Sequence, residues 1–237
     1  MRVFENQSFD GLLDRDSGAV FSDMDIVKCR FLSCRVSITE NLAHRSTVRN
    51  VRFFHCEQRA CAVNTAILEN ILVDGLKTHG RFDTWGAVFK HVTLKGRIGN
   101  LKISDFIVAA DASPALRHKI NLRFQAANAE YYKNVDWALD ISQSEFEHVD
   151  IRGIPISLIR RDPETQVVVR REKAVALQDE WRKLDLTQTY WPIALQDVIS
   201  EEHNDGEVFA APKRHRNFNC LLAGLQALRR IGVAEPD

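Results

Sequence analysis

The sequence has 237 residues, 45% of them hydrophobic and 27% charged, and its 32 Lys and Arg balance its 32 Asp and Glu. A chain of this length can bury a substantial hydrophobic core as one large domain, with room for a smaller appendage. The zero net charge excludes a protein that is a polycation or a DNA-mimicking polyanion over its whole length.

The first residues and the cysteines indicate the compartment. Residues Met1–Asp10 are mixed polar and lack the apolar stretch of a signal peptide, and no apolar run reaches the roughly 18 residues of a membrane span. The sequence contains five cysteines, Cys29, Cys34, Cys56, Cys61 and Cys220. An odd number without a signal peptide fits free thiols in a reducing compartment. We therefore expect a cytoplasmic protein without a membrane segment.

Five-residue units with apolar residues at their first and third positions organise the first two thirds of the chain. Three consecutive units read Met24-Asp25-Ile26, Cys29-Arg30-Phe31 and Cys34-Arg35-Val36 over their first three positions. The same pattern returns at Val51, Cys61, Ile71, Val92, Leu101, Val135 and Val149. Alternating apolar residues are typical of short strands that bury one face.

A residue that tolerates the left-handed backbone region precedes many of these units. These residues are Asp23, Asn50, Asn70, His91, Asn100, Asn134 and His148. We interpret each of them as a corner where the chain turns between two strands. Asn50, Asn70 and His91 follow one another at intervals of about 20 residues, which predicts the coil length. The interval from His91 to Asn134 is about twice as long and predicts two coils, one degenerate and containing the weak unit Asn121-Leu122-Arg123-Phe124.

Coils of about 20–21 residues with five-residue faces predict a mainly β, four-sided solenoid whose stacked coils share one core. From Met24 to Gly96 the units resemble those of the pentapeptide-repeat family, and the resemblance implies a right-handed parallel β-helix. The chain departs from the family pattern because Val or Ile often replaces its small residue and Arg often replaces its Asp. A larger irregular β-helix and an ordinary β-sandwich remain alternatives.

From Pro163 onward the pattern changes. Val167–Val169 are expected to close the solenoid as a last strand. Helical spacing predicts helices over 172–184, from Pro192 onward and over 217–231. We therefore expect a β-helix over residues 1–170 and a C-terminal α-helical cap over 171–237. The helices cover the open end of the solenoid or bind a partner, which includes a second copy of the chain as a homodimer.

The spacing of the cysteines is compatible with zinc ligands, because Cys29 and Cys34, like Cys56 and Cys61, have four residues between them. The same spacing equals the length of one face of the solenoid. We expect all four side chains to point into the core, where Cys behaves as a small apolar residue. The sequence therefore predicts neither a metal nor a cofactor.

Charge is unevenly distributed, since residues 28–102 hold 13 Lys and Arg against 5 Asp and Glu. The candidate partner-binding residues are Arg30, Arg35, Arg49, Arg52, Arg59, Lys90 and Lys95. Outward basic residues on stacked coils form ladders. Such ladders attract an acidic partner, or they are a solvated sheet face whose charges protect its edges. A protein partner is favoured over nucleic acid, because basic and aromatic residues are not interleaved as in RNA-binding sheets. Some pentapeptide-repeat proteins resemble duplex DNA through acidic outer faces, and this role does not transfer to basic positions.

These observations predict a non-catalytic scaffold, such as a bacterial-type inhibitor or immunity-like protein that acts by steric and electrostatic occlusion. The alternative is a polysaccharide-active β-helix hydrolase or lyase with paired carboxylates on an outer face. Its candidate residues are Asp74, Asp83, Asp105, Asp111, Asp136, Asp140 and Asp150. We assign no catalytic residue, because the sequence contains no phosphate-binding glycine loop, nucleophile elbow or zinc-binding helix motif.

Overall fold

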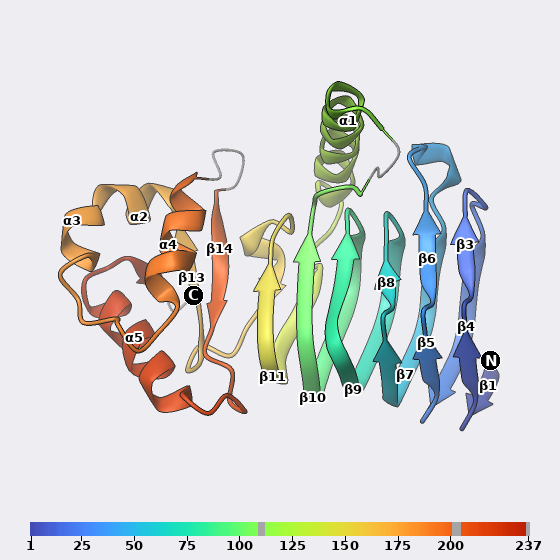
Figure 1. Cartoon of the computed structure of the whole chain (residues 1–237), viewed down its shortest axis with the longest axis horizontal. Helices are drawn as coiled ribbons and strands as arrows, with labels where there is room; N and C mark the ends of the chain where they lie inside the picture. Colours follow the sequence, from blue (N-terminus) through green and yellow to red (C-terminus); the bar gives the residue numbers. More distant parts are fainter. Residues whose placement is uncertain (109–111, 201–204, 236–237) are drawn as a thin grey trace.

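The computed structural model describes residues 1–108, 112–200 and 205–235. Two sheets make up the β structure of these residues, a curled sheet of twelve strands and a second sheet of three strands (Figure 1). The C-terminal helices lie around the second sheet, at the far end of the molecule from the N-terminus. The expectation of a mainly β fold with a parallel sheet is therefore confirmed.

The curled sheet is parallel at every pairing of its described strands. Its first strands are β1 (Arg2–Glu5), β2 (Ser8–Asp10), β3 (Leu13–Arg15), β4 (Val20–Val27), β5 (Arg30–Leu32) and β6 (Arg35–Ile38). The others are β7 (Thr47–Arg59), β8 (Ala62–Val63), β9 (Ile67–Trp85), β10 (Val88–Ser104), β11 (Leu139–Ile151) and β12 (Ile159–Arg160). The main path runs β1-β4-β7-β9-β10-β11-β12, and each strand on it follows its neighbour after one circuit of the chain.

The register gives the length of each circuit. Val51 pairs with Ile71, and Ile71 pairs with Val92. The corner side chains just before them, Asn50, Asn70 and His91, bond to one another across steps of twenty and twenty-one residues. The predicted spacing is therefore confirmed for these strands. The circuit from β4 to β7 is longer, because the short helix η1 (Leu42–His44) adds a loop before β7.

Left-handed backbone, with φ from 48° to 88°, recurs every five residues around these circuits. The positions are Asn6, Gly11 and Asp16, then Asp23, Lys28 and Ser33, then Asn50, His55 and Ala60, then Asn70, Gly75 and Gly80, then His91 and Gly96. The predicted corners at Asp23, Asn50, Asn70 and His91 are therefore confirmed. The corners predicted at Asn100, Asn134 and His148 are wrong. Asn100 and His148 pair with each other inside strands β10 and β11, and Asn134 ends a helical turn.

The inward residues of the five-residue units form the core of the curled sheet. Cys29, Cys34, Cys56 and Cys61 are all buried, as their spacing predicts, and their thiols are free. An aromatic column runs from the N-terminal end through Phe4, Phe9, Phe31 and Phe53, with ring centroids 6.1, 5.2 and 6.4 Å apart.

The predicted degenerate coil between His91 and Asn134 is wrong, because helix α1 (Pro114–Tyr132) occupies this segment. Strand β10 pairs directly with β11, so the helix is an insertion that stands beside the sheet (Figure 1). Ser113 caps its N-terminus, and Phe124 and Ile120 pack against Ile107. The apolar residues that resembled a weak strand unit are therefore one buried face of a helix.

The second sheet has β13 (Gln166–Arg170) at its centre, antiparallel to β14 (Gly206–Ala210) and β15 (Ala234–Glu235). Val167–Val169 therefore do not form the last strand of the curled sheet, which was the prediction. Period two explains the placement. Val168 packs into the core of the curled sheet, whereas Val167 and Val169 pack into a second core.

The C-terminal helices pack around this second core. Their bounds are α2 (Arg171–Ala176), α3 (Gln178–Trp181), α4 (Trp191–Ser200) and α5 (Phe218–Arg230). The predicted helix over 172–184 is broken at Leu177, whereas the helices expected from Pro192 and over 217–231 match α4 and α5. A further short helix, η2 (Ile156–Leu158), precedes β12. In the described part of the chain, no helix combines the length and apolar character that crossing a membrane requires.

Candidate binding face

The seven predicted partner-binding residues lie on several rows of the curled sheet. Arg49 and Lys90 share a row in which Glu69 stands between them. Arg52 and Lys95 lie on the next face, in separate rows. Arg35 belongs to a row around the opposite side of the circuit, where Ala62 and Asp83 follow it. The seven residues therefore do not form one continuous Arg-rich face.

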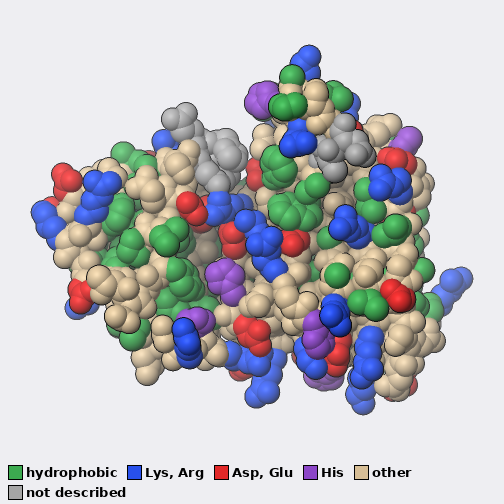
Figure 2. All heavy atoms as spheres, viewed as in Figure 1, with side chains coloured by type: hydrophobic (Ala, Val, Ile, Leu, Met, Phe, Trp, Pro, Cys, Tyr) green, Lys and Arg blue, Asp and Glu red, His purple; other side chains and the backbone are tan. Residues whose placement is uncertain are grey.

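Carboxylates neutralise several of these cations within their own rows. Arg52 forms a bidentate pair with Asp25, at 2.7 and 2.6 Å, and this bond holds the pKa of the Asp25 carboxyl below its usual value. Lys95 Nζ lies 3.1 Å from Asp74 Oδ2. Positive and negative side chains are interspersed over the visible surface (Figure 2). The basic excess of residues 28–102 is thus spread as mixed ladders.

A groove of about 370 Å³ lies on the outer surface, and Arg30 is 4.0 Å from Glu57 in its wall. Register places Arg30 beside Glu57, and Glu57 beside Lys77. Arg59 lies beside His79 in the next row of the same face. The charged residues that line the groove are Glu57, Lys77, Arg97, Glu147 and Arg214, and His55 lies among them. Arg214 comes from the segment before α5, so the groove joins the curled sheet to the C-terminal part.

Two glycines in the wall of this groove pack closely against neighbouring side chains. A Cβ on Gly75, which has φ of 76°, would lie 2.9 Å from His55 Nδ1. A Cβ on Gly99 would collide with Thr78 Oγ1. A side chain at either position would therefore meet a neighbour, which explains glycine at these two points of β9 and β10.

On one wall of the groove, three basic side chains surround Glu57. Its carboxylate lies 3.2 Å from His79 Nε2, 3.6 Å from Lys77 Nζ and 4.0 Å from Arg30 Nε. The hydrogen bond to His79, together with the two nearby cations, lowers the pKa of Glu57. On the other wall, Arg214 Nη2 lies 3.4 Å from Glu147 Oε1. Both acidic residues of the groove are therefore already engaged by cations.

Sequence reasoning missed Lys77, His79, Arg97 and Arg214 as members of one site. Counting five residues from the recognised corner Asn70 would have placed Lys77 and His79 on the face of Arg30. Arg214 lies within a run of basic residues, and only the fold brings it to the groove.

The candidate carboxylates of the enzyme alternative do not gather in one groove. Asp74 pairs with Lys95, and Asp83 lies in another row, 2.7 Å from Arg81 Nε. Asp150 shares the row of Asp83, but Lys102 lies between them and binds Asp150 at 3.2 Å. The remaining candidates have other partners: Asp105 binds Gln125, Asp136 binds His91, and Asp140 binds Ser142. Asp111 lies outside the described residues.

Within the described ranges, no three His, Cys, Asp or Glu side chains are grouped so that they could hold a metal ion. The inward cysteines donate to backbone carbonyls, as Cys56 does to Ile26 at 3.4 Å. Comparisons with protein-family models, with curated proteins and with solved structures found no match to this chain.

Proposed function

We propose that this protein is a non-catalytic scaffold that binds an acidic segment of a protein partner across the groove between Glu57 and Arg214. The observation that carries the proposal is the composition of the groove. Lys77, Arg97 and Arg214 line it, and Arg30 lies 4.0 Å from Glu57, so these four cations outnumber the two carboxylates of the groove, Glu57 and Glu147, with which Lys77, Arg30 and Arg214 pair. A segment with carboxylates would therefore meet attraction along both walls.

The electrostatic argument favours a polypeptide with spaced carboxylates over a small anion. Exposed cations such as Lys77, with 63% of its side chain accessible, gain little from one isolated ion pair. Several such pairs along an extended segment add up, and they steer the approach of the partner.

We infer that the curled sheet is a four-sided, right-handed β-helix with the C-terminal helices as its cap. Circuits of twenty and twenty-one residues with left-handed corners every five residues support four faces. A rigid rod of this kind presents its groove without rearrangement, which suits an inhibitor or immunity-like protein that acts by occlusion in the cytoplasm.

The test compares two triple variants of equal charge change. The groove variant carries Lys77→Glu, Arg97→Glu and Arg214→Glu, and the matched control carries Arg35→Glu, Arg49→Glu and Lys90→Glu. A partner is captured from the native cell with wild-type protein and identified, and its affinity for each variant is then measured at two salt concentrations. We expect the groove variant to lose at least tenfold in affinity, the control to keep it, and binding to weaken with salt.

Equal losses in both variants would show that overall charge governs binding, and no loss in the groove variant would remove this face from consideration. A parallel assay for reducing ends released from acidic and neutral polysaccharides addresses the enzyme alternative. Release that persists in both variants would replace the scaffold proposal with a hydrolase or lyase.

A further inference from the structure

The core of the curled sheet contains a cavity of about 300 Å³ between strands β4 and β10. Two inward rows line it, Met24-Val51-Ile71-Val92 and Ile26-Phe53-Val73-Leu94. Each row crosses four neighbouring strands, so the cavity extends about 14 Å along the stack at roughly 4.8 Å per strand. Its volume is about twice that of the ~150 Å³ apolar cavity that takes up benzene in an engineered protein.

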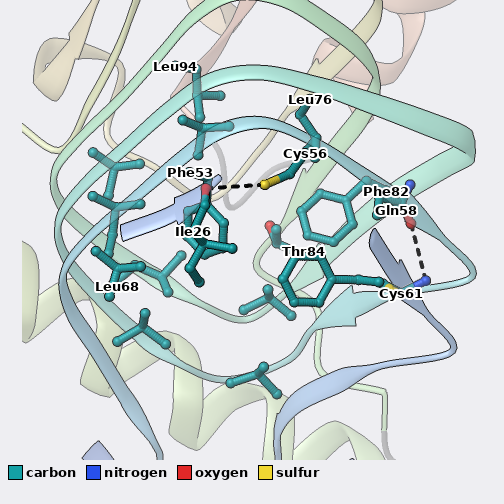
Figure 3. A pocket seen from close by; sticks show the side chains of 18 of the residues that line it. Ile26, Phe53, Cys56, Gln58, Cys61, Leu68, Leu76, Phe82, Thr84 and Leu94 are labelled. Atoms are coloured by element: carbon teal, nitrogen blue, oxygen red, sulfur yellow. Dashed lines mark hydrogen bonds between the residues drawn. The ribbon is translucent and has the colours of Figure 1, made fainter. Parts of the chain in front are cut away.

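Apolar side chains form most of the cavity wall, and among the described residues no Lys, Arg, His, Asp or Glu lines it. Figure 3 shows the Phe53 and Phe82 rings, Ile26, Leu68 and Leu94 around this space. The cysteine thiols in the wall donate to backbone carbonyls, as Cys61 does to Arg59 at 3.4 Å. A charged ligand would lose its hydration here without a counterion.

Two polar side chains in the wall have atoms without a hydrogen-bond partner in the described part of the chain. Gln58 is 3% exposed, and its Oε1 accepts from the Cys61 backbone N–H at 3.2 Å, which leaves its Nε2 group without a partner. Thr84 is 4% exposed, and its Oγ1 also has none. Both lie beside the same cavity (Figure 3). An unsatisfied buried polar atom is costly, so a ligand that pairs with both groups would recover free energy.

We propose that this cavity binds a neutral aliphatic molecule that carries one hydroxyl or carbonyl oxygen. The Gln58 Nε2 group donates to that oxygen, and the Thr84 hydroxyl donates to a carbonyl or accepts from a hydroxyl. The apolar rows enclose the chain of the ligand. This ligand class follows from a long apolar wall, two neutral polar groups and the lack of a lining charge.

The first circuit of the chain offers a route for entry. Among the described strands, β1, β2 and β3 each pair with only one neighbour, so they separate at lower cost than strands paired on both sides. None of their residues lines the cavity. Their local opening would expose the Phe31 end of the aromatic column without unfolding the rest of the sheet.

The test uses decanol and decane as probes of purified full-length protein. Decanol at about a hundred times its dissociation constant is expected to raise the melting temperature by roughly 5–10 °C, and to bind at least tenfold more tightly than decane. In the double variant Gln58→Leu, Thr84→Val that preference should disappear while decane binding remains. Thr93→Val, on an outward row outside the cavity, is the matched control and should keep the preference.

A second readout separates a ligand site from a packing defect. Without ligand, Thr84→Val should melt at a higher temperature than wild type, because it removes an unpaired buried hydroxyl. Val51→Phe, checked for folding by circular dichroism, should fill the cavity and abolish binding of both probes. The proposal is overturned if wild type binds neither probe, if the preference for decanol survives in the double variant, or if Val51→Phe binds decane unchanged.

Discussion

Ala60 provides a sharp test of the left-handed corners, because it has φ of 54° and an exposed methyl group. Holding an L-residue in this region costs about 1–2 kcal/mol relative to the right-handed region. Glycine avoids that cost but loses about 0.5–1 kcal/mol through the larger freedom of its unfolded chain. Ala60→Gly should therefore stabilise the protein by about 0.5–1 kcal/mol.

Gly11 supplies the reverse experiment, since it has φ of 63° and an added Cβ would have no atom within 4 Å. Gly11→Ala should lose about the same amount of unfolding free energy, because the added methyl group contacts nothing and only the cost of the left-handed conformation changes. Ala126→Gly, at an exposed position in α1, controls for a general effect of glycine and should lose about 1 kcal/mol.

Urea unfolding followed by far-UV circular dichroism measures all three variants. At a slope of about 2 kcal/mol per molar, Ala60→Gly should raise the midpoint by roughly 0.3 M and Gly11→Ala should lower it by a similar amount, with the slope unchanged. A lower midpoint for Ala60→Gly together with an unchanged midpoint for Gly11→Ala would refute left-handed corners at five-residue spacing.

Three further substitutions test the contacts that hold the parts together. Arg45→Met removes hydrogen bonds to the Thr65 carbonyl at 2.5 Å and the Asn128 side chain at 2.9 Å. The opening free energy of the α1 amides, measured by hydrogen exchange, should therefore fall by about 2–3 kcal/mol. The lowered pKa of Glu57 adds stability above its unfolded pKa that is lost as pH falls through the folded value. Below about pH 4.5, Glu57→Gln should therefore lose a few tenths of a kcal/mol less unfolding free energy than wild type, measured by urea midpoints across pH. Gly224→Ala places a methyl group 2.6 Å from the Trp191 ring and should cost about 1–3 kcal/mol, seen as a lower melting temperature with altered tryptophan fluorescence.

The sequence predicted the curled sheet where its units were regular. Inward cysteines and one corner of each circuit were visible because Asn, Asp and His are recognisable at left-handed positions. The corners at Lys28, Ser33 and Ala60 were missed because these residues carry no such preference. Their conformation follows from the stacking of neighbouring circuits, and a five-residue count from Asp23 or Asn50 would have located all three.

The sequence failed where one apolar pattern serves two structures. Phe124 and Ile120 have the spacing of a helix face, but the count of residues between corners favoured a strand there. Val167–Val169 form a continuous apolar run that fits any strand buried on both faces. Only the tertiary arrangement shows that its two faces belong to two different cores.

The groove illustrates why residue types alone do not define a binding site. Arg52 resembled an outward cation free to bind a partner, yet the long circuit that contains η1 places Asp25 directly beside it. Arg30 and Lys77 lie on either side of Glu57 because that long circuit precedes Glu57 and a shorter one follows it. The length of each circuit therefore decides which charges meet, and a composition count cannot supply it.

The two ends of the curled sheet face opposite physical problems. At the C-terminal end, Val168 and Val208 continue the core into the second sheet. At the N-terminal end, β1, β2 and β3 leave one edge unpaired, and Val3 and Leu13 are exposed beside it.

These strands are only three or four residues long, and residues 1–27 carry six acidic side chains against two basic ones. Short edge strands and like charge both oppose pairing with another copy, because a head-to-head contact would bring two acidic ends together. Although the net charge of the whole chain is zero, acidic residues are thus in excess at the unpaired N-terminal edge, which most needs protection. The basic residues that balance them lie along the mixed ladders.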